Sequence, residues 1–194
     1  MEDHRWFANL LPEGGARESL CRIYGISVSN NAALSGKIGV ECAGALRILP
    51  EVSDDTDGSE KDGYRDIDFE NLKEITAGRK TLEVLHQEGP PRLSLAGSQD
   101  KWAVKWDGQR LSLPYGRAPS THILKFPTGR VPGLAENEAF VSRLGAECGL
   151  STVDTMVLNS ALLIPRYDRA EEVDGVIRRM HHDQPGKDLL QLIR

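Results

Sequence analysis

The pattern of apolar and polar positions is clearest between residues 92 and 127, where short apolar and β-branched runs alternate with polar residues. A period of two residues is typical of strands with one buried face. Asp107-Gly108 is a strong hairpin signal and predicts a two-residue turn between two of these strands. We therefore expect a mostly antiparallel sheet, with strands at 92–95, at 102–106, after the Asp-Gly turn, and at 121–126.

Two lysines give this stretch a possible chemistry. Ala96, Gly97 and Ser98 form a small-residue turn that Lys101 closes, and Lys125 lies in the last of the expected strands. Small side chains let backbone N–H groups approach an anion, and a nearby cation adds charge. The stretch therefore predicts a sheet that binds phosphate. Taken singly, such a turn is more often structural, and a lysine on a strand is more often a surface residue.

Helical signals occur on both sides of this sheet. Asp66 or Asp68 is a candidate N-cap. Phe140, Leu144 and Cys148 recur every four residues, so we expect this apolar stripe, Cys148 included, to lie in the core. The expected helices are 17–24 before Gly25, 31–35, a helix containing Phe69, Leu72 and Ile75, a turn at 80–86, and 134–150 ended by Gly149.

The remaining segments complete the expected order of elements. A glycine-punctuated strand should end at 48–50, and strands at 153–158 and 161–167 should be joined by a turn at Asn159-Ser160. Residues 51–63 carry six acidic residues and one lysine with no apolar period. This composition favours a solvated loop over a calcium site, because the twelve-residue loop with its closing glutamate is absent.

Composition narrows the class of protein. The 194 residues are 39% hydrophobic and 27% charged, values typical of a globular protein with one good core. A net charge of −5 argues against a basic nucleic-acid-binding domain. Cys21, Cys42 and Cys148 are odd in number and lack metal-ligand spacing, which favours a reducing compartment. With no signal-peptide pattern and no long apolar run, we expect a soluble, cytoplasmic protein that makes no membrane contact.

The order of elements from 92 to 167 is that of the small lobe of a protein kinase. In that arrangement a strand lysine contacts the α/β-phosphates of ATP, and a helix carboxylate holds the lysine in place. Lys125 would be the strand lysine, and Glu138 its partner, with Glu136 as the alternative. Tyr167 and its neighbours would form the hinge against adenine. The stretch SLAGSQDK lacks both the Walker spacing and the usual kinase glycine-rich loop.

Four ordered motifs are more specific than the pattern of elements. SLAGSQDK, STHILKFP, ENEAF with LGAECGL, and RYDR resemble the HipA family of bacterial serine/threonine kinases, the toxins of toxin–antitoxin pairs. Upstream, FANLLPEGGAR and IGVECAGALRILP look like the amino-terminal subdomain that precedes that kinase core. The resemblance covers residues 6–182. It implies an α+β fold, in which a small mixed α/β subdomain precedes a kinase-like small lobe.

The resemblance also implies roles for individual residues. Ser94 matches the serine that is autophosphorylated in the family, so the protein would be a phosphoprotein. Lys125 matches the ATP-contacting lysine, and Pro165 stands where the family often has an acid. The implied ATP-binding residues are the phosphate loop Ala96, Gly97, Ser98, Gln99, Asp100 and Lys101, then Lys125, and the hinge Pro165, Arg166 and Tyr167.

The resemblance further implies four parts. These are the tail of the amino-terminal subdomain (1–50), an acidic loop and helical connector (51–91), the kinase small lobe (92–169), and the start of a truncated large lobe (170–194). In the family the large lobe supplies the catalytic aspartate and the magnesium ligands. No catalytic-loop motif follows Tyr167, so we expect an incomplete chain that is inactive alone, with ATP and Mg²⁺ as cofactors of the whole enzyme.

Two functions remain open at this stage. In the first, the chain is the front portion of a HipA-type kinase that phosphorylates itself and a protein in translation. A HipB-like helix-turn-helix antitoxin would be its partner, and DNA contact would be indirect, through that antitoxin. In the second, the chain is a non-catalytic interaction module that binds an antitoxin or a partner kinase chain.

Overall fold

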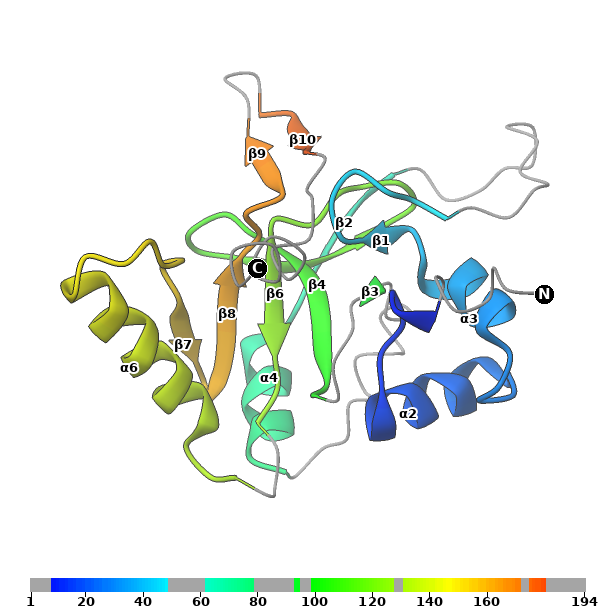
Figure 1. Cartoon of the computed structure of the whole chain (residues 1–194), viewed down its shortest axis with the longest axis horizontal. Helices are drawn as coiled ribbons and strands as arrows, with labels where there is room; N and C mark the ends of the chain where they lie inside the picture. Colours follow the sequence, from blue (N-terminus) through cyan, green and yellow to red (C-terminus); the bar gives the residue numbers. More distant parts are fainter. Residues whose placement is uncertain are drawn as a thin grey trace, which may run out of the picture.

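The computed structural model describes residues 8–48, 62–78, 93–94, 99–127, 131–171 and 175–180. The expected α+β fold is confirmed: a small helical unit lies beside a larger, mostly antiparallel sheet (Figure 1). The expected helical turn at 80–86 lies outside the described residues, as do residues 96–98 of the expected phosphate loop. No helix of the described part is both long and apolar enough to cross a membrane.

The helical unit begins with α2 (Gly14–Tyr24) and α3 (Asn31–Ile38), both longer than expected. Gly25 ends α2 as predicted: it adopts the left-handed conformation (φ 63°), which a residue with a Cβ rarely does. The side chain of Asn30 caps α3 by accepting a hydrogen bond from the N–H of Ala33 at 3.0 Å. The small core of this unit consists of Leu11, Leu20, Cys21, Leu34 and Ile38.

The strand expected to end at 48–50 is much shorter. Strand β1 contains only Glu41–Cys42, and it pairs in parallel with β3 (Leu93–Ser94). Gly44 turns the chain immediately afterwards with a φ of 65°, so the strand cannot continue. The strand predicted at 92–95 therefore joins the helical unit, and it is not part of the larger sheet.

The larger sheet has six described strands in the order β2-β5-β4-β6-β8-β7, each antiparallel to its neighbours. The expected strands at 102–106, 121–126 and 161–167 all lie in it. β7 begins three residues later than expected. The strands are β2 (Gly63–Asp66), β4 (Lys101–Trp106), β5 (Leu111–Tyr115), β6 (His122–Lys125), β7 (Met156–Leu158) and β8 (Ala161–Pro165).

The two hairpin turns of the sheet differ in outcome. Asn159 and Ser160 form the expected two-residue turn, and both adopt positive φ values (47° and 63°). The prediction of a two-residue turn at Asp107-Gly108 is wrong, because Trp106 pairs with Leu111 and four residues connect them. The carboxylate of Asp107 accepts hydrogen bonds from the backbone N–H groups of residues 109 and 110, which stabilises the longer loop.

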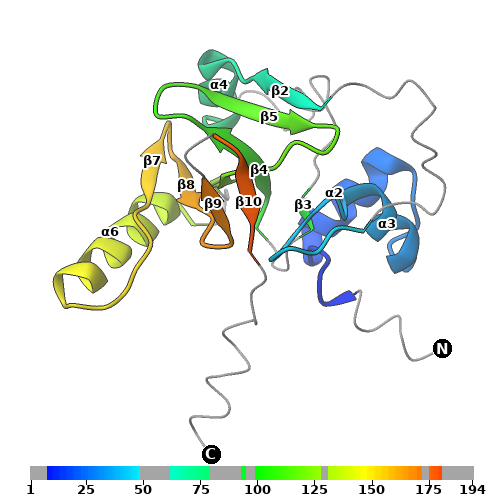
Figure 2. The same cartoon turned by 90° about the horizontal axis from the view of Figure 1, so that it is seen from above.

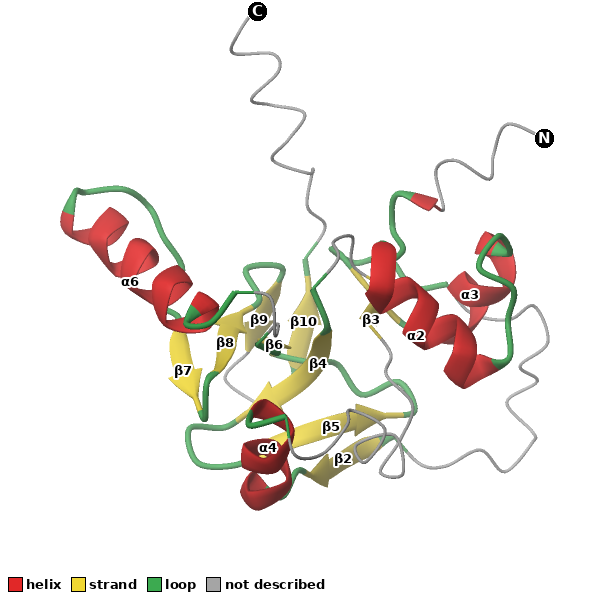
Figure 3. Cartoon of the chain, turned by 90° about the horizontal axis from the view of Figure 1, so that it is seen from below, coloured by secondary structure: helices red, strands yellow, loops and turns green. Residues whose placement is uncertain are grey.

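The sheet unit begins before residue 92. Gly63, expected at the end of a solvated loop, starts the edge strand β2. Asp68 caps the helix α4 (Phe69–Thr76) by accepting from the N–H of Glu70 at 2.9 Å. Leu72 and Ile75 of α4 are buried against one face of the sheet, in a core with Trp102, Val104, Leu111, Leu113, Leu124, Phe126 and Leu163 (Figure 3). The described part of the expected connector, residues 62–78, therefore packs with the sheet.

Helix α6 (Leu134–Glu147) lies against β8 and the edge strand β7 (Figures 1 and 2). Phe140 is 64% exposed and Leu144 51% exposed, so the prediction that this stripe, with Cys148, lies in the core is wrong. Two small residues of α6 lie at close contacts instead. Ala135 is buried, and a Cβ added at Gly145 would stand 3.0 Å from the side chain of Thr152, in the loop that follows the helix.

Candidate functional site

The two lysines of the expected phosphate site lie opposite each other on neighbouring strands. Lys101 begins β4 and Lys125 ends β6, and the two residues are direct partners in the antiparallel register. Cross-strand partners project from the same face of a sheet, at Cβ distances of about 5 Å. The face that carries them is opposite to the α4 face, because Trp102 and Leu124, the next pair along, belong to the core. One anion can therefore meet both ammonium groups.

Helix α6 supplies the carboxylate that fixes one of these lysines. Lys125 Nζ donates to Glu138 Oε2 at 2.7 Å, and both side chains are about 30% exposed (27% and 31%). Glu136, the alternative partner, lies in the first turn of the helix and is exposed. A half-buried, charge-assisted hydrogen bond holds the ammonium in one place. The sequence-based pairing of Lys125 with Glu138 thus matches the geometry.

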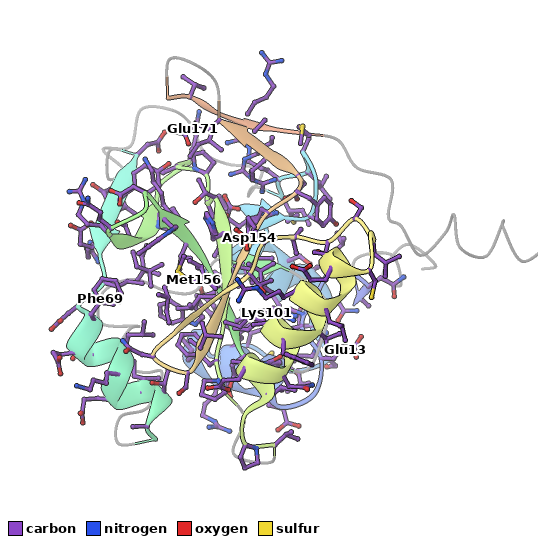
Figure 4. All side chains as sticks on the ribbon, turned by 90° about the vertical axis from the view of Figure 1, so that its left-hand side faces the viewer. Glu13, Phe69, Lys101, Asp154, Met156 and Glu171 are labelled. Atoms are coloured by element: carbon purple, nitrogen blue, oxygen red, sulfur yellow. The ribbon has the colours of Figure 1, made fainter. Side chains whose placement is uncertain are left out.

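The charges near Lys101, which is labelled in Figure 4, suit an anion. Burial lowers the pKa of the Lys101 ammonium, the charge of Lys125 lowers it further, and the carboxylate of Glu13 opposes both. Two ammonium groups held side by side repel each other, and a bound phosphate would offset that repulsion. The residues present therefore suit a phosphate ester, with Lys125 already oriented by α6.

Residues 99 and 100 connect the expected loop to the lysine strand. Gln99 Nε2 donates to the carbonyl oxygen of Phe126 at 2.8 Å, and the N–H of Phe126 donates to the carbonyl oxygen of Asp100 at 3.0 Å. Burial raises the pKa of the Asp100 carboxyl. These contacts fix the end of the loop. Ala96, Gly97, Ser98 and the side chain of Ser94 lie outside the described residues, so their roles stay predictions.

The expected hinge follows β8. Pro165 is the last residue of the strand and pairs with His122, and the N–H of Arg166 donates to the carbonyl oxygen of Thr121 at 2.9 Å. The side chain of Arg166 is buried and points toward the helical unit, while Tyr167 is 56% exposed. The backbone carbonyl oxygen of Arg166 accepts from the N–H of Arg169 at 3.2 Å. The hinge role of all three residues stays a prediction.

A buried ion cluster joins this hinge to the helical unit. Its centre is Glu41 of β1, whose side chain is 1% exposed. Glu41 Oε2 accepts from Arg166 at 2.9 Å and from Arg169 at 3.2 Å, and Oε1 accepts from Arg179 at 2.6 Å. The hydroxyl of Ser120 also donates to Glu41, at 2.8 Å. Arg169 and Arg179 belong to the paired strands β9 (Arg169–Glu171) and β10 (Ile177–Arg179).

The second carboxylate of the cluster is Asp168. Its two oxygens accept from Arg166 Nε at 2.9 Å and from Arg166 Nη2 at 2.8 Å, and Oδ2 also accepts from the N–H of Gly44 at 2.6 Å. Arg166 Nη2 donates to the carbonyl oxygen of Cys42 as well, at 2.8 Å. Three arginines and two carboxylates are thus assembled from the helical unit, the hinge and the β9–β10 pair.

Comparison with known proteins decides the family. A family model described as the HipA-like C-terminal domain matches residues 93–193, and one described as the HipA N-terminal domain matches residues 2–49. The chain is 36% identical over 184 residues to Y4mE of Sinorhizobium fredii, a protein named as a kinase. This match covers 92% of the chain and 44% of Y4mE. The chain belongs to the HipA family.

Two further HipA relatives come from Shewanella oneidensis. The serine/threonine-protein kinase toxin HipA is 29% identical over 170 residues, covering 84% of this chain and 37% of the toxin. A solved complex of HipA, HipB and operator DNA contains a chain that superposes with a TM-score of 0.67 and 29% identity, over 90% of this chain and 41% of that one. The chain thus spans about two fifths of the length of the HipA proteins it matches.

Sequence reasoning overlooked Glu41, Ser120, Arg169 and Arg179. A usable signal existed: Glu41 interrupts an otherwise apolar and small-residue run, and a buried carboxylate requires cationic partners. The HipA-like motif RYDR offered two arginines, but nothing local indicated that they are directed at residue 41. Among the described residues, no group of three or more His, Cys, Asp or Glu side chains is arranged to hold a metal ion.

The cluster predicts acid sensitivity. Burial alone would raise the pKa of Asp168, but the hydrogen bonds and charge of Arg166, the charge of Arg169 and the Gly44 N–H outweigh it, and the pKa lies below its ordinary value of 3.8. The folded state therefore binds this proton less readily than the unfolded chain. Its stabilising contribution is complete above pH 4 and is lost as the pH falls through the lowered pKa.

We expect the free energy of unfolding, measured by urea titration from pH 7 to pH 2.5, to decline below about pH 4. Asp168→Asn should be less stable than the parent at pH 7, with a shallower acid decline. Asp154→Asn, at an exposed position, is the matched control and should keep the parent profile. An unchanged acid decline in Asp168→Asn would contradict the assignment.

Proposed function

We propose that this chain forms the ATP-binding, amino-terminal portion of a HipA-type serine/threonine kinase toxin. The phosphates would lie against Lys101 and Lys125, and the adenine against residues 165–167. The observation that carries the proposal is the pairing of Lys101 with Lys125 across two strands, together with the 2.7 Å bond from Lys125 to Glu138. The HipA relatives named as kinases support it.

The chemistry follows from charge and position. Phosphoryl transfer depends on holding the triphosphate in line and on neutralising the charge that develops on its oxygens. Glu138 keeps Lys125 oriented before ATP arrives, so less side-chain entropy is lost on binding. Mg²⁺ would bridge phosphate oxygens and supply further charge neutralisation. Its ligands and the catalytic aspartate would come from the remaining length of the HipA fold, in the large lobe.

Ser94 is the proposed site of autophosphorylation. Its backbone lies in β3, paired with Cys42, directly before the proposed phosphate loop. A phosphate there adds about two negative charges close to the site of the triphosphate. Like charges repel, so a phosphorylated Ser94 would lower the affinity for ATP.

The proposed partner is a HipB-like helix-turn-helix antitoxin, and contact with DNA would be made mainly through it. The solved relative from Shewanella oneidensis is a complex of HipA with HipB and operator DNA, which supports this assignment. The proposed substrate is a protein hydroxyl in the translation machinery, and it rests on the family resemblance alone.

Lys125→Met tests the ATP site. We expect it to weaken ATP binding by about ten- to a hundredfold, since a charge-assisted hydrogen bond contributes about 1.5–3 kcal/mol. Calorimetric titration of this chain, alone and fused to the large lobe of a HipA relative, measures the affinity. Lys73→Met is the matched control, because it removes the same charge from the exposed surface of α4.

Equal ATP affinity of the parent and the Lys125→Met fusions would contradict the proposal. If the parent fusion bound no ATP at all, the alternative of a non-catalytic interaction module would be favoured instead. Detectable ATP hydrolysis or Ser94 phosphorylation by the chain alone would exclude that alternative.

A further inference from the structure

The two-residue strand β1 contacts both segments that the proposed nucleotide site requires. On one side, Glu41 and Cys42 pair with Leu93 and Ser94 of β3, which lead into the proposed phosphate loop. On the other side, Glu41 and Cys42 accept hydrogen bonds from Arg166, in the proposed hinge. Strand β1 lies between the helices α2 and α3 and the six-stranded sheet (Figure 1). It therefore links the two ends of the site through the helical unit.

The link to the hinge is made on both sides of Tyr167. Before it, Arg166 donates to the Glu41 carboxylate at 2.9 Å and to the Cys42 carbonyl oxygen at 2.8 Å. After it, Asp168 accepts from the N–H of Gly44 at 2.6 Å. Because residues 166 and 168 are both anchored, the backbone of residue 167 has little freedom to shift relative to β1.

Glu41 supplies the charged contact of this anchor. It is the carboxylate that contacts Arg166, Arg169 and Arg179 together, at 2.9, 3.2 and 2.6 Å. Without its charge, the three cations would repel one another, and Arg166 and Arg169 would share Asp168 as their carboxylate partner. Arg166 would keep its hydrogen bonds to Asp168 and to the Cys42 carbonyl oxygen, but it would lose its charged contact with β1.

We propose that Glu41 is a positioning residue of the nucleotide site, which holds residues 165–168 at the separation from β3 that an adenine nucleotide must span. This inference rests on the proposed ATP site. It adds that the helical unit helps to position the residues of that site. Glu41 itself touches no nucleotide. The ordering of β1 and the binding of nucleotide are therefore coupled, so a change that loosens β1 also lowers the affinity for nucleotide.

Comparing two ligands distinguishes a positioning role of Glu41 from a general loss of stability. Adenosine triphosphate must reach both the lysines and the hinge, whereas inorganic tripolyphosphate needs the lysines alone. We expect Glu41→Gln to weaken ATP binding by about tenfold and to leave tripolyphosphate binding within about twofold of the parent, measured by calorimetry on the full chain. Lys125→Met should weaken both ligands, because it removes a phosphate contact.

Two further variants keep the test decisive. Ser120→Ala removes the hydroxyl that donates to Glu41 and accepts from Arg166 while keeping every charge, so it should fold and show a smaller loss for ATP alone. If Glu41→Gln does not fold, as judged by circular dichroism, the Ser120→Ala result decides. Glu70→Gln, with a side chain that is 75% exposed, is the control and should change neither affinity.

The outcomes are distinguishable. Equal weakening of both ligands in folded Glu41→Gln, or no change in either, would overturn the positioning role while leaving the ATP site intact. If Lys125→Met failed to weaken either ligand, the ATP site itself would be wrong, and the role of Glu41 would be overturned with it. Loss of ATP affinity alone supports the inference.

Discussion

Replacing Glu41 by alanine should lower the free energy of unfolding by about 3–5 kcal/mol, because removing one partner of a buried ion cluster leaves uncompensated charge. The effect is expected to be large since three arginines contact this carboxylate, and its side chain is 1% exposed. Domains of this size are stable by about 5–15 kcal/mol, so the loss is a substantial fraction of the total. Urea titration at pH 7, followed by circular dichroism, measures it.

Glu70→Ala provides the matched comparison. Glu70 contacts Lys73 at 3.8 Å on the surface of α4, and both side chains are more than half exposed. Exposed pairs of this kind contribute less than about 1 kcal/mol. Similar losses in Glu41→Ala and Glu70→Ala would mean that the buried cluster does not stabilise the junction between the helical unit and the hinge.

Truncating Leu124 to alanine should cost about 2–5 kcal/mol, the range for a large aliphatic side chain removed from a packed core. Leu124 is fully buried in β6, where it pairs with Trp102 on one side and Leu163 on the other. Its side chain points toward α4, away from Lys125, which is the next residue. We therefore expect lower stability with an unchanged ATP affinity of the folded fraction.

The comparison for this variant is Leu150→Ala, at a position that is 66% exposed. It removes the same atoms and should change the urea midpoint little. A weaker ATP affinity in folded Leu124→Ala would show that the core face and the lysine face of the sheet are not independent.

Local signals predicted those elements whose ends are fixed by neighbouring residues. Gly25 ends α2 with a positive φ, Asp68 caps α4, and Asn159-Ser160 make a two-residue turn. In each case the residue type itself selects the backbone conformation. The alternation of apolar residues around Lys125 likewise placed the lysine opposite to the core, which is why its pairing with Lys101 was predictable.

The errors share a different cause. The buried side of α6 carries Ala135, and Gly145 lies close to Thr152 of the following loop, whereas the larger Phe140 and Leu144 are exposed. Spacing along the helix reveals an apolar stripe, but it does not reveal which side the sheet will take. The same applies to β2: its first residue, Gly63, was expected to end the acidic loop, but residues 63–66 pair with β5 as a strand.

The candidate site shows the same division. Lys125 and Glu138 are 13 residues apart, and a strand followed by a helix brings them together as expected. Glu41 and Arg166 are 125 residues apart, and no period or cap connects them. Their contact depends on how two units pack, which residue-by-residue reasoning does not supply.

The separation between Glu41 and its partners has a consequence for biosynthesis. The small core of the helical unit joins residues between Leu11 and Ile38, all close in sequence, so α2 and α3 can form soon after they leave the ribosome. Arg166, Arg169 and Arg179 are translated long afterwards, and until then the carboxylate of Glu41 remains hydrated. Closing so long a loop is slow. The junction between the two units is therefore the last part of the described fold to assemble.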